Sequence, residues 1–198
     1  QPGIFEYSNL GAAWPARRLE LATGKDFAQF TRERIFAPLG MTSTAWFAYE
    51  LAGRQIASSF VAPGAPAYAF GVSPYAIGNL RASAHDLAQF MIMWTNDGVA
   101  ANGQRLLAPG TVASALVSTA SSPNDRAGFY WLKRWAPTRG RDLWAHDGMI
   151  EGICTQLTID PVTKDGVVVL TNGKCFHPAR AHIDAIENRV LQALDTLP

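Results

Sequence analysis

The residues best suited to chemistry lie in two tripeptides far apart in the chain, Tyr7-Ser8-Asn9 near its beginning and His146-Asp147-Gly148 in its last third. A phenol and an imidazole can hold or pass a proton, and an amide side chain offers both a donor and an acceptor. Taken alone, the first tripeptide is ordinary turn chemistry, and His146 could equally be a solvated histidine at a strand end. Their meaning depends on whether the fold brings them together.

A nucleophile to accompany these groups is not evident in the chain. No serine is followed three places later by lysine, a spacing in which a catalytic serine is found beside its lysine. Thr171-Asn172-Gly173-Lys174 has threonine in that spacing, but it follows an expected strand instead of opening a helix, so we interpret it as a turn. The histidines include no i, i+4 pair and the cysteines no Cys-x-x-Cys, so we predict neither a metal site nor a cofactor.

Composition restricts the class of protein. Hydrophobic residues make up 48% and charged residues 17% of the 198 positions, which is typical of a globular chain and argues against disorder. The net charge is +1 with the charges scattered, so we do not expect a nucleic-acid partner. No stretch approaches the roughly 18 consecutive apolar residues of a membrane span. Cys154 and Cys175 flank an expected hairpin and could approach each other, but two thiols in such a chain are more often free than bonded, so the sequence leaves their pairing open.

Periodicity and chain breakers indicate helices in the first part of the chain and strands in the second. Helices are predicted over residues 10–23, 26–37, 83–96, 109–119 and 178–194, and strands over 128–136, 142–146, 152–160 and 166–171. Residues 161–165 have the composition of a hairpin turn. We therefore predict an α+β fold in which a helical region is followed by an antiparallel sheet with a C-terminal helix packed on it. Residues 1–125, with a long loop at 41–81, and residues 126–198 are expected to be two parts of one unit.

Several motifs in order resemble one family. They are Tyr7-Ser8-Asn9 between Pro2-Gly3 and Gly11, Ile35 to Met41, Gly78-Asn79-Leu80, His146-Asp147-Gly148, Gly166 to Asn172, and His177-Pro178-Ala179-Arg180. Together they are similar to the serine β-lactamase and penicillin-binding-protein superfamily, in particular to class C β-lactamases and related D-alanyl-D-alanine carboxypeptidases and esterases. The resemblance covers nearly the whole chain and implies an incomplete β-lactamase or transpeptidase-like fold.

The resemblance implies catalytic roles for Tyr7 and His146. Tyr7 matches the family tyrosine that relays a proton between nucleophile and leaving group. A tyrosine has a pKa of about 10, so it acts as a base only beside cationic groups. His146 matches the first position of the family's strand motif, where it can position Tyr7 or a substrate carboxylate.

The same resemblance implies substrate-binding roles for further residues. Asn9 matches the residue whose amide contacts the substrate's amide, and Gly148 lets a substrate backbone approach the strand. The backbone N–H of Met149 would be an oxyanion donor. Arg180 matches an arginine near the substrate carboxylate, and His177 replaces an asparagine of the family. Asp147 occupies a position that is usually small or hydroxylated, so we expect it to disfavour anionic substrates.

The function implied is that of a serine hydrolase acting through an acyl-serine intermediate on an ester, an amide or a D-amino-acid peptide. We expect its nucleophile on a preceding segment of the same protein, so this chain alone should be inactive. The alternative is a catalytically inactive relative that binds a ligand or has a regulatory role. A periplasmic or secreted location is favoured only by the resemblance.

Overall fold

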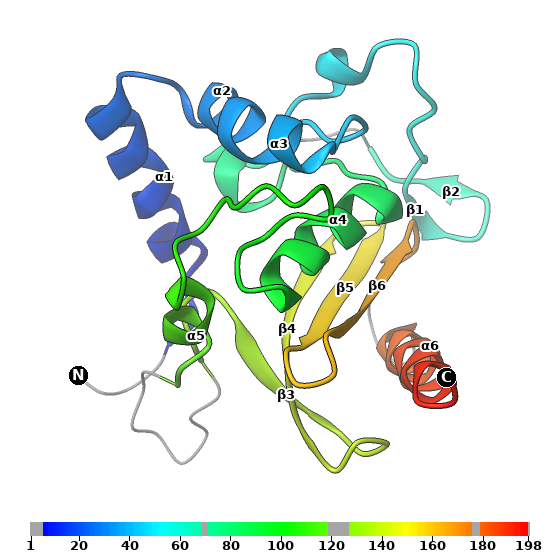
Figure 1. Cartoon of the computed structure of the whole chain (residues 1–198). Coiled ribbons are helices and arrows are strands. Elements are labelled where there is room, and N and C mark those ends of the chain that lie inside the picture. Colours follow the sequence, from blue (N-terminus) through cyan, green and yellow to red (C-terminus); the bar gives the residue numbers. More distant parts are fainter. Residues whose placement is uncertain (1–5, 69–70, 119–126, 176–178, 198) are drawn as a thin grey trace.

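The computed structural model describes residues 6–68, 71–118, 127–175 and 179–197. Its helical elements come first and its main sheet follows, as Figure 1 shows. The elements are α1 (Asn9–Thr23), α2 (Phe27–Thr31), the π-helical turn η1 (Arg32–Phe36), α3 (Ala37–Leu39), the 3-10 turns η2 (Ala48–Leu51) and η3 (Tyr75–Ile77), β1 (Phe60–Ala62), β2 (Ala65–Pro66), α4 (Ala84–Thr95), α5 (Thr111–Ala115), β3 (Leu132–Ala136), β4 (Arg141–Ile150), β5 (Ile153–Asp160), β6 (Asp165–Thr171) and α6 (Ala179–Leu194).

The first helix begins and ends where its sequence dictates. The Ser8 hydroxyl accepts a hydrogen bond from the Gly11 backbone N–H at 3.0 Å and so caps the N-terminus of α1. Gly24 ends the helix with φ of 69°, a left-handed conformation that glycine adopts without a steric penalty. The Ser8 cap matters for the site because it fixes the direction in which the chain enters α1, between Tyr7 and Asn9.

The main sheet is antiparallel throughout, with the strand order β3-β4-β5-β6. Its register pairs Leu132 of β3 with Ala145 of β4, and Ala145 with Thr158 of β5. The five residues of β3 pair with Arg141–Ala145 alone, so the second half of β4 extends beyond the end of β3. Strands β1 and β2 form a separate two-stranded hairpin, which lies beside the end of β6 because Phe60 donates its N–H to the carbonyl oxygen of Asn172 at 2.9 Å.

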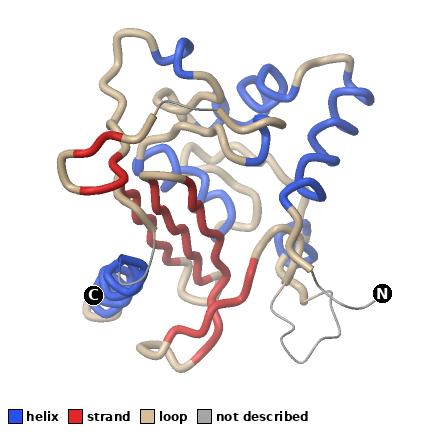
Figure 2. Tube along the Cα trace, turned by 180° about the vertical axis from the view of Figure 1, so that it is seen from behind, coloured by secondary structure: helices blue, strands red, loops and turns tan. Residues whose placement is uncertain are grey.

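The sheet separates two apolar clusters. On one face Trp144 and Ile159 pack with Met91 of α4 and with Trp131. On the other face Leu143, Val167 and Val169 pack with Ile183 and Leu191 of α6. The helices α4 and α6 therefore cover opposite faces, and Figures 1 and 2 show this layering from opposite sides. The predicted α+β fold, with an antiparallel sheet and a C-terminal helix packed on it, is confirmed.

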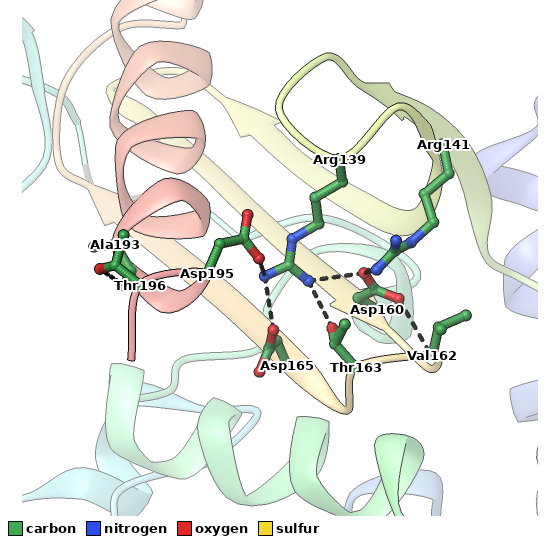
Figure 3. A network of polar contacts seen from close by, with 9 residues as sticks. All are labelled: Arg139, Arg141, Asp160, Val162, Thr163, Asp165, Ala193, Asp195 and Thr196. Carbon is green, nitrogen blue, oxygen red and sulfur yellow. Dashed lines mark hydrogen bonds and ion pairs between the residues drawn. The ribbon is translucent and has the colours of Figure 1, made fainter. Parts of the chain in front are cut away.

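An arginine network joins the β5–β6 end of the sheet to the end of α6 (Figure 3). The Arg139 side chain, which is 2% exposed, lies in the turn between β3 and β4 and forms ion pairs with Asp160, Asp165 and Asp195 at 2.7, 2.7 and 2.9 Å. Arg141 forms a further ion pair with Asp160. Because these aspartates lie at the two ends of the β5–β6 turn and just after α6, one guanidinium joins three segments of the chain.

The strand predicted over residues 128–136 is shorter in the structure. Residues 128–131 form a turn, closed by the Gly128 N–H donating to the Trp131 carbonyl oxygen at 2.8 Å, and Tyr130 has φ of 61°. The aromatic composition predicts a strand, but the turn leaves only Leu132–Ala136 to pair. The helix predicted over 109–119 is likewise only α5, Thr111–Ala115.

The two cysteines are bonded, a question that the sequence left open. Cys154 and Cys175 form a disulfide with their Cα atoms 4.8 Å apart. The register explains the approach, because Cys154 pairs with Thr171 near the end of β6 and Cys175 follows only four positions later. Within the described part of the chain, no helix is both long enough and apolar enough to cross a bilayer.

Candidate active site

Tyr7, Asn9 and His146 come together from distant parts of the chain. The Tyr7 hydroxyl donates a hydrogen bond to Oδ1 of Asn9 at 3.1 Å, and the ring centroids of Tyr7 and His146 lie 6.4 Å apart. The capped start of α1 supplies the first two side chains, and β4 supplies the third. Tyr7 is 58% exposed, so the group is open to solvent. A phenol, an amide and an imidazole thus share one accessible location.

The backbone edge beside His146 has no strand on its outer side. His146–Ile150 pairs with β5 on one side, whereas β3 pairs only as far as Ala145, and no other strand of the described residues takes its place. An unpaired edge presents N–H and C=O groups that an extended peptide can bind by adding a strand. The edge therefore gives the site a means of aligning an amide-containing substrate next to Tyr7 and Asn9.

The imidazole of His146 is held by its own strand. Its Nδ1 lies 3.0 Å from the carbonyl oxygen of Asp147. A carbonyl oxygen can only accept, so Nδ1 donates its proton in this contact. The ring of His146 is therefore fixed by its own strand at its place beside Tyr7.

Neighbouring side chains of β4 project to opposite faces of the sheet. Trp144 packs on the α4 face and Leu143 on the α6 face, so His146 and Gly148 belong to the α4 face, and Asp147 and Met149 to the α6 face. The side chain of Met149 is exposed. The role predicted for its backbone N–H as an oxyanion donor stays a prediction.

Asp147 is engaged by two arginines on the α6 face. Its carboxylate lies 2.6 Å from Arg134 of β3 and 3.0 Å from Arg180 of α6. Asp147 is thus paired with two cations and lies on the face opposite His146, and the expected repulsion of anionic substrates stays a prediction. Arg180 also lies 3.3 Å from Asp184, so its guanidinium binds protein carboxylates here. Its contact with a substrate carboxylate stays a prediction, and His177 lies outside the described residues.

The space beside Gly148 is occupied by its neighbour on β5. A Cβ at this position would lie 2.4 Å from Oγ1 of Thr155, the residue directly opposite, and that hydroxyl lies 3.4 Å from the Gly148 carbonyl oxygen. The sequence did not point to Thr155 or Arg134, since only the strand register reveals which residues face the motif.

No group of three or more His, Cys, Asp or Glu side chains within the described ranges is placed to hold a metal ion.

Comparison with known proteins identifies the family and the fold. Residues 3–192 match the family described as Beta-lactamase. Penicillin-binding protein 4 of Amycolatopsis lactamdurans is 27% identical over 186 residues, which are 86% of this chain and 48% of that protein. The octameric penicillin-binding protein homologue from Pyrococcus abyssi superposes with a TM-score of 0.79 at 21% identity, covering 98% of this chain and 43% of that one. A class C β-lactamase from Rhodobacter sphaeroides gives 0.77 at 20% identity, covering 98% and 62%.

Each comparison covers most of this chain but a smaller share of the other protein. The chain is matched almost from end to end, whereas it spans about half the length of the curated relative, 48%. The solved structures, at identities of 20–21%, show that the fold is shared. The family match covers far more than half of the chain, from residue 3 to residue 192. The chain belongs to the β-lactamase family.

Proposed function

We propose that this chain forms two walls of the active site of a serine hydrolase that works through an acyl-serine intermediate. Tyr7 and Asn9 make one wall, and His146 with the unpaired edge of β4 makes the other. The observation that carries the proposal is the meeting of Tyr7, Asn9 and His146 beside that edge. We further propose that the nucleophilic serine and its lysine lie on a segment of the protein outside residues 1–198.

The proposed roles follow from the contacts. His146, with Nδ1 engaged by the Asp147 carbonyl, lies beside Tyr7 and positions it. Tyr7 passes the proton from the serine hydroxyl to the leaving group, a role typically worth about 10² to 10⁴ in rate. Asn9 holds the substrate amide by exchanging its bond to Tyr7 for bonds to the substrate. The Met149 N–H stabilises the negative charge on the carbonyl oxygen.

The substrate class follows from the open edge of β4. An extended amide or D-amino-acid peptide can pair with His146–Ile150, and a small ester needs only the acyl position. Because the carboxylate of Asp147 is paired on the opposite face, the site does not discriminate against anionic acyl groups on that account. The proposed substrates are therefore esters, amides or D-amino-acid peptides of either charge.

The surface of α1 supports a further segment packing there. Leu10, Trp14 and Leu21 are 66%, 63% and 64% exposed and lie on one face of the helix, at positions i, i+4 and i+11. Three large apolar side chains grouped on one helix usually mark a covered surface. The curated relative is about twice as long as the matched part, so a partner segment from the same protein is the occupant we propose.

The test compares the full-length protein with the 198-residue chain. Each is incubated with a fluorescent penicillin and with a p-nitrophenyl ester, and covalent labelling and turnover are measured. We expect label and turnover in the full-length protein and neither in the short chain. In the full-length protein, Tyr7→Phe and Asn9→Ala should lower turnover by about 10²-fold or more. Tyr68→Phe, at a tyrosine that is 91% exposed, is the matched control.

Each outcome decides between two functions. Labelling or turnover by the short chain would overturn the placement of the nucleophile. A full-length protein with neither, but with saturable binding of penicillin, would identify a catalytically inactive ligand-binding relative.

A further inference from the structure

The turn at residues 128–131 carries two aromatic side chains that are exposed although they touch each other. Phe129 is 63% exposed and Tyr130 is 46% exposed, and their rings meet edge to face with centroids 4.9 Å apart. Neither ring belongs to an apolar cluster of the described residues. Single exposed apolar residues are common, but two aromatic rings in contact on a surface are typical of a place where a partner or ligand binds.

The backbone of Tyr130 is a second sign of a functional role. Its φ of 61° is left-handed. A bulky residue adopts this conformation at a cost in stability, whereas glycine adopts it freely. Strained residues of this kind cluster at active sites and at places where ligands are held. A tyrosine in this position is explained if its ring contacts a ligand.

The turn is held against the face of the sheet that carries His146. A Cβ added to Gly128 would lie 2.9 Å from the Trp144 ring and 2.7 Å from the Ala115 carbonyl oxygen, so the chain packs closely on both. That carbonyl oxygen also accepts a hydrogen bond from the Phe129 N–H at 2.8 Å. Trp144 lies on the α4 face two positions before His146, which is about 7 Å along a strand. The aromatic pair therefore starts from a fixed backbone next to the proposed active site.

The turn also lies where the edge of β4 becomes open. Leu132 and Ala145 form the last pair between β3 and β4, and residues 128–131 come directly before Leu132. An extended substrate bound along the open edge, from Ile150 toward His146, therefore ends against this turn.

The orientation of the substrate follows from the roles proposed above. Tyr7 passes a proton to the leaving group and lies beside His146, whereas the Met149 N–H, three positions further along β4, stabilises the carbonyl oxygen. The leaving group is therefore on the side of the turn. We propose that Phe129 and Tyr130 form an apolar subsite for an aromatic group in the leaving-group half of the substrate. This inference rests on the proposed function, since it concerns the same site.

The experiment measures the selectivity of the full-length protein between phenethyl acetate and butyl acetate. The two esters share the acetyl group and release primary alcohols, so they differ in the aromatic ring of the leaving group. We expect kcat/KM to favour the phenethyl ester by about tenfold or more, and Phe129→Ala to remove most of this preference. Tyr49→Ala, which removes a ring that is 75% exposed and stacked on Phe47, is the matched control and should keep the preference.

Variants of Tyr130 separate the ring from the strained backbone. Tyr130→Gly and Tyr130→Ala both remove the ring and should lose the preference equally. Tyr130→Gly should have the higher urea midpoint of the two, because only glycine is free of the left-handed strain. Tyr130→Phe keeps the ring and should keep the preference.

The outcomes distinguish this inference from the proposed function. Turnover of p-nitrophenyl acetate with no preference for the phenethyl ester, or a preference that persists in Phe129→Ala and Tyr130→Gly, would overturn the inference alone. If these variants lose turnover of both esters by the same factor, the inference is also wrong and the rings pack against another segment of the protein. No turnover of any of the three esters by the unmodified protein would contradict the proposed function as well.

Discussion

His146 and Asp147 are consecutive residues of β4, yet the imidazole lies beside Tyr7 and the carboxylate lies between Arg134 and Arg180. Successive side chains of a strand point to opposite faces, so the two side chains lie on opposite sides of the sheet. One tripeptide therefore contributes to two places, a solvent-exposed group on the α4 face and an ion-pair cluster on the α6 face. The register of β4, and not the tripeptide itself, decides which side chain can meet a substrate.

Asp147→Asn tests this separation in the full-length protein. Because the carboxylate faces away from His146, the substitution should change the turnover of an anionic and of a neutral ester by the same factor. It leaves two arginines less well paired, and since the group is partly exposed the loss of stability should be about 1 kcal/mol or less. The measurement is the ratio of kcat/KM for the two esters. A selective gain for the anionic ester would contradict the assigned face.

Gly148→Ala tests the contact with Thr155. The new methyl group would lie 2.4 Å from Oγ1 of Thr155, and overpacking of this kind costs about 1–3 kcal/mol, measured as a loss in the free energy of unfolding by urea. The double variant Gly148→Ala/Thr155→Ala should recover most of that loss. Gly173→Ala, where the added Cβ meets no atom within 4 Å, should be nearly neutral. A loss that persists in the double variant would point to the backbone of Gly148 instead.

The elements that could be predicted from sequence are those set by local chemistry. Apolar periodicity and chain breakers gave α1, α4 and α6 within a few residues, and the turn at 161–165 gave the β5–β6 hairpin. The strand predicted at Phe129 and Tyr130 is wrong, because a turn with positive φ at Tyr130 overrides their strand-forming composition.

Features that depend on register could not be predicted in the same way. Thr155 faces Gly148, and Arg134 reaches Asp147, only because of how three strands align. The Cys154–Cys175 bond likewise follows from the β5–β6 pairing, which brings together cysteines 21 positions apart. The resemblance gave the meeting of Tyr7 with His146, for which periodicity alone offers no signal.

Reduction of the disulfide should destabilise the protein. The bond closes a loop of 21 positions, for which the loss of chain entropy in the unfolded state corresponds to about 3 kcal/mol. The urea midpoint should therefore fall on addition of dithiothreitol. The double variant Cys154→Ala/Cys175→Ala should be less stable than the oxidised protein and insensitive to the reductant. If the reductant does not change the urea midpoint of the unmodified protein, its cysteines are free.

Lys164→Gly should stabilise the β5–β6 turn. Lys164 is exposed and has φ of 63°, a left-handed conformation that costs a residue with a side chain about 1 kcal/mol and costs glycine little. Greater freedom of glycine in the unfolded chain offsets part of the gain, so an increase of about 0.5 kcal/mol is expected. Val162→Gly, in the same turn without positive φ, should instead lose stability. Equal losses in the two variants would mean that the Lys164 backbone is not left-handed in solution.

Asp160 should make the stability of the fold depend on acid pH. Burial alone would raise the pKa of its carboxyl, but hydrogen bonds from Arg141 and Arg139 and from the Val162 N–H outweigh burial and hold the pKa below its ordinary value of 3.8. The unfolded chain therefore binds the proton more readily than the folded one. The stabilisation is complete above the ordinary value and is lost as the pH falls through the lower pKa of the folded state.

Asp160→Asn isolates this contribution. Urea midpoints of the variant and the unmodified protein, measured from pH 7 to pH 2, should differ most near neutrality and converge as the pH falls below about 4, because protonated Asp160 and asparagine are both neutral. Asp97→Asn, at an aspartate 51% exposed in its pair with Arg105, should give a curve parallel to that of the unmodified protein. If the urea midpoints of Asp160→Asn and the unmodified protein differ by the same amount at every pH, then packing, and not the charge paired with Arg139 and Arg141, accounts for the stabilisation by Asp160.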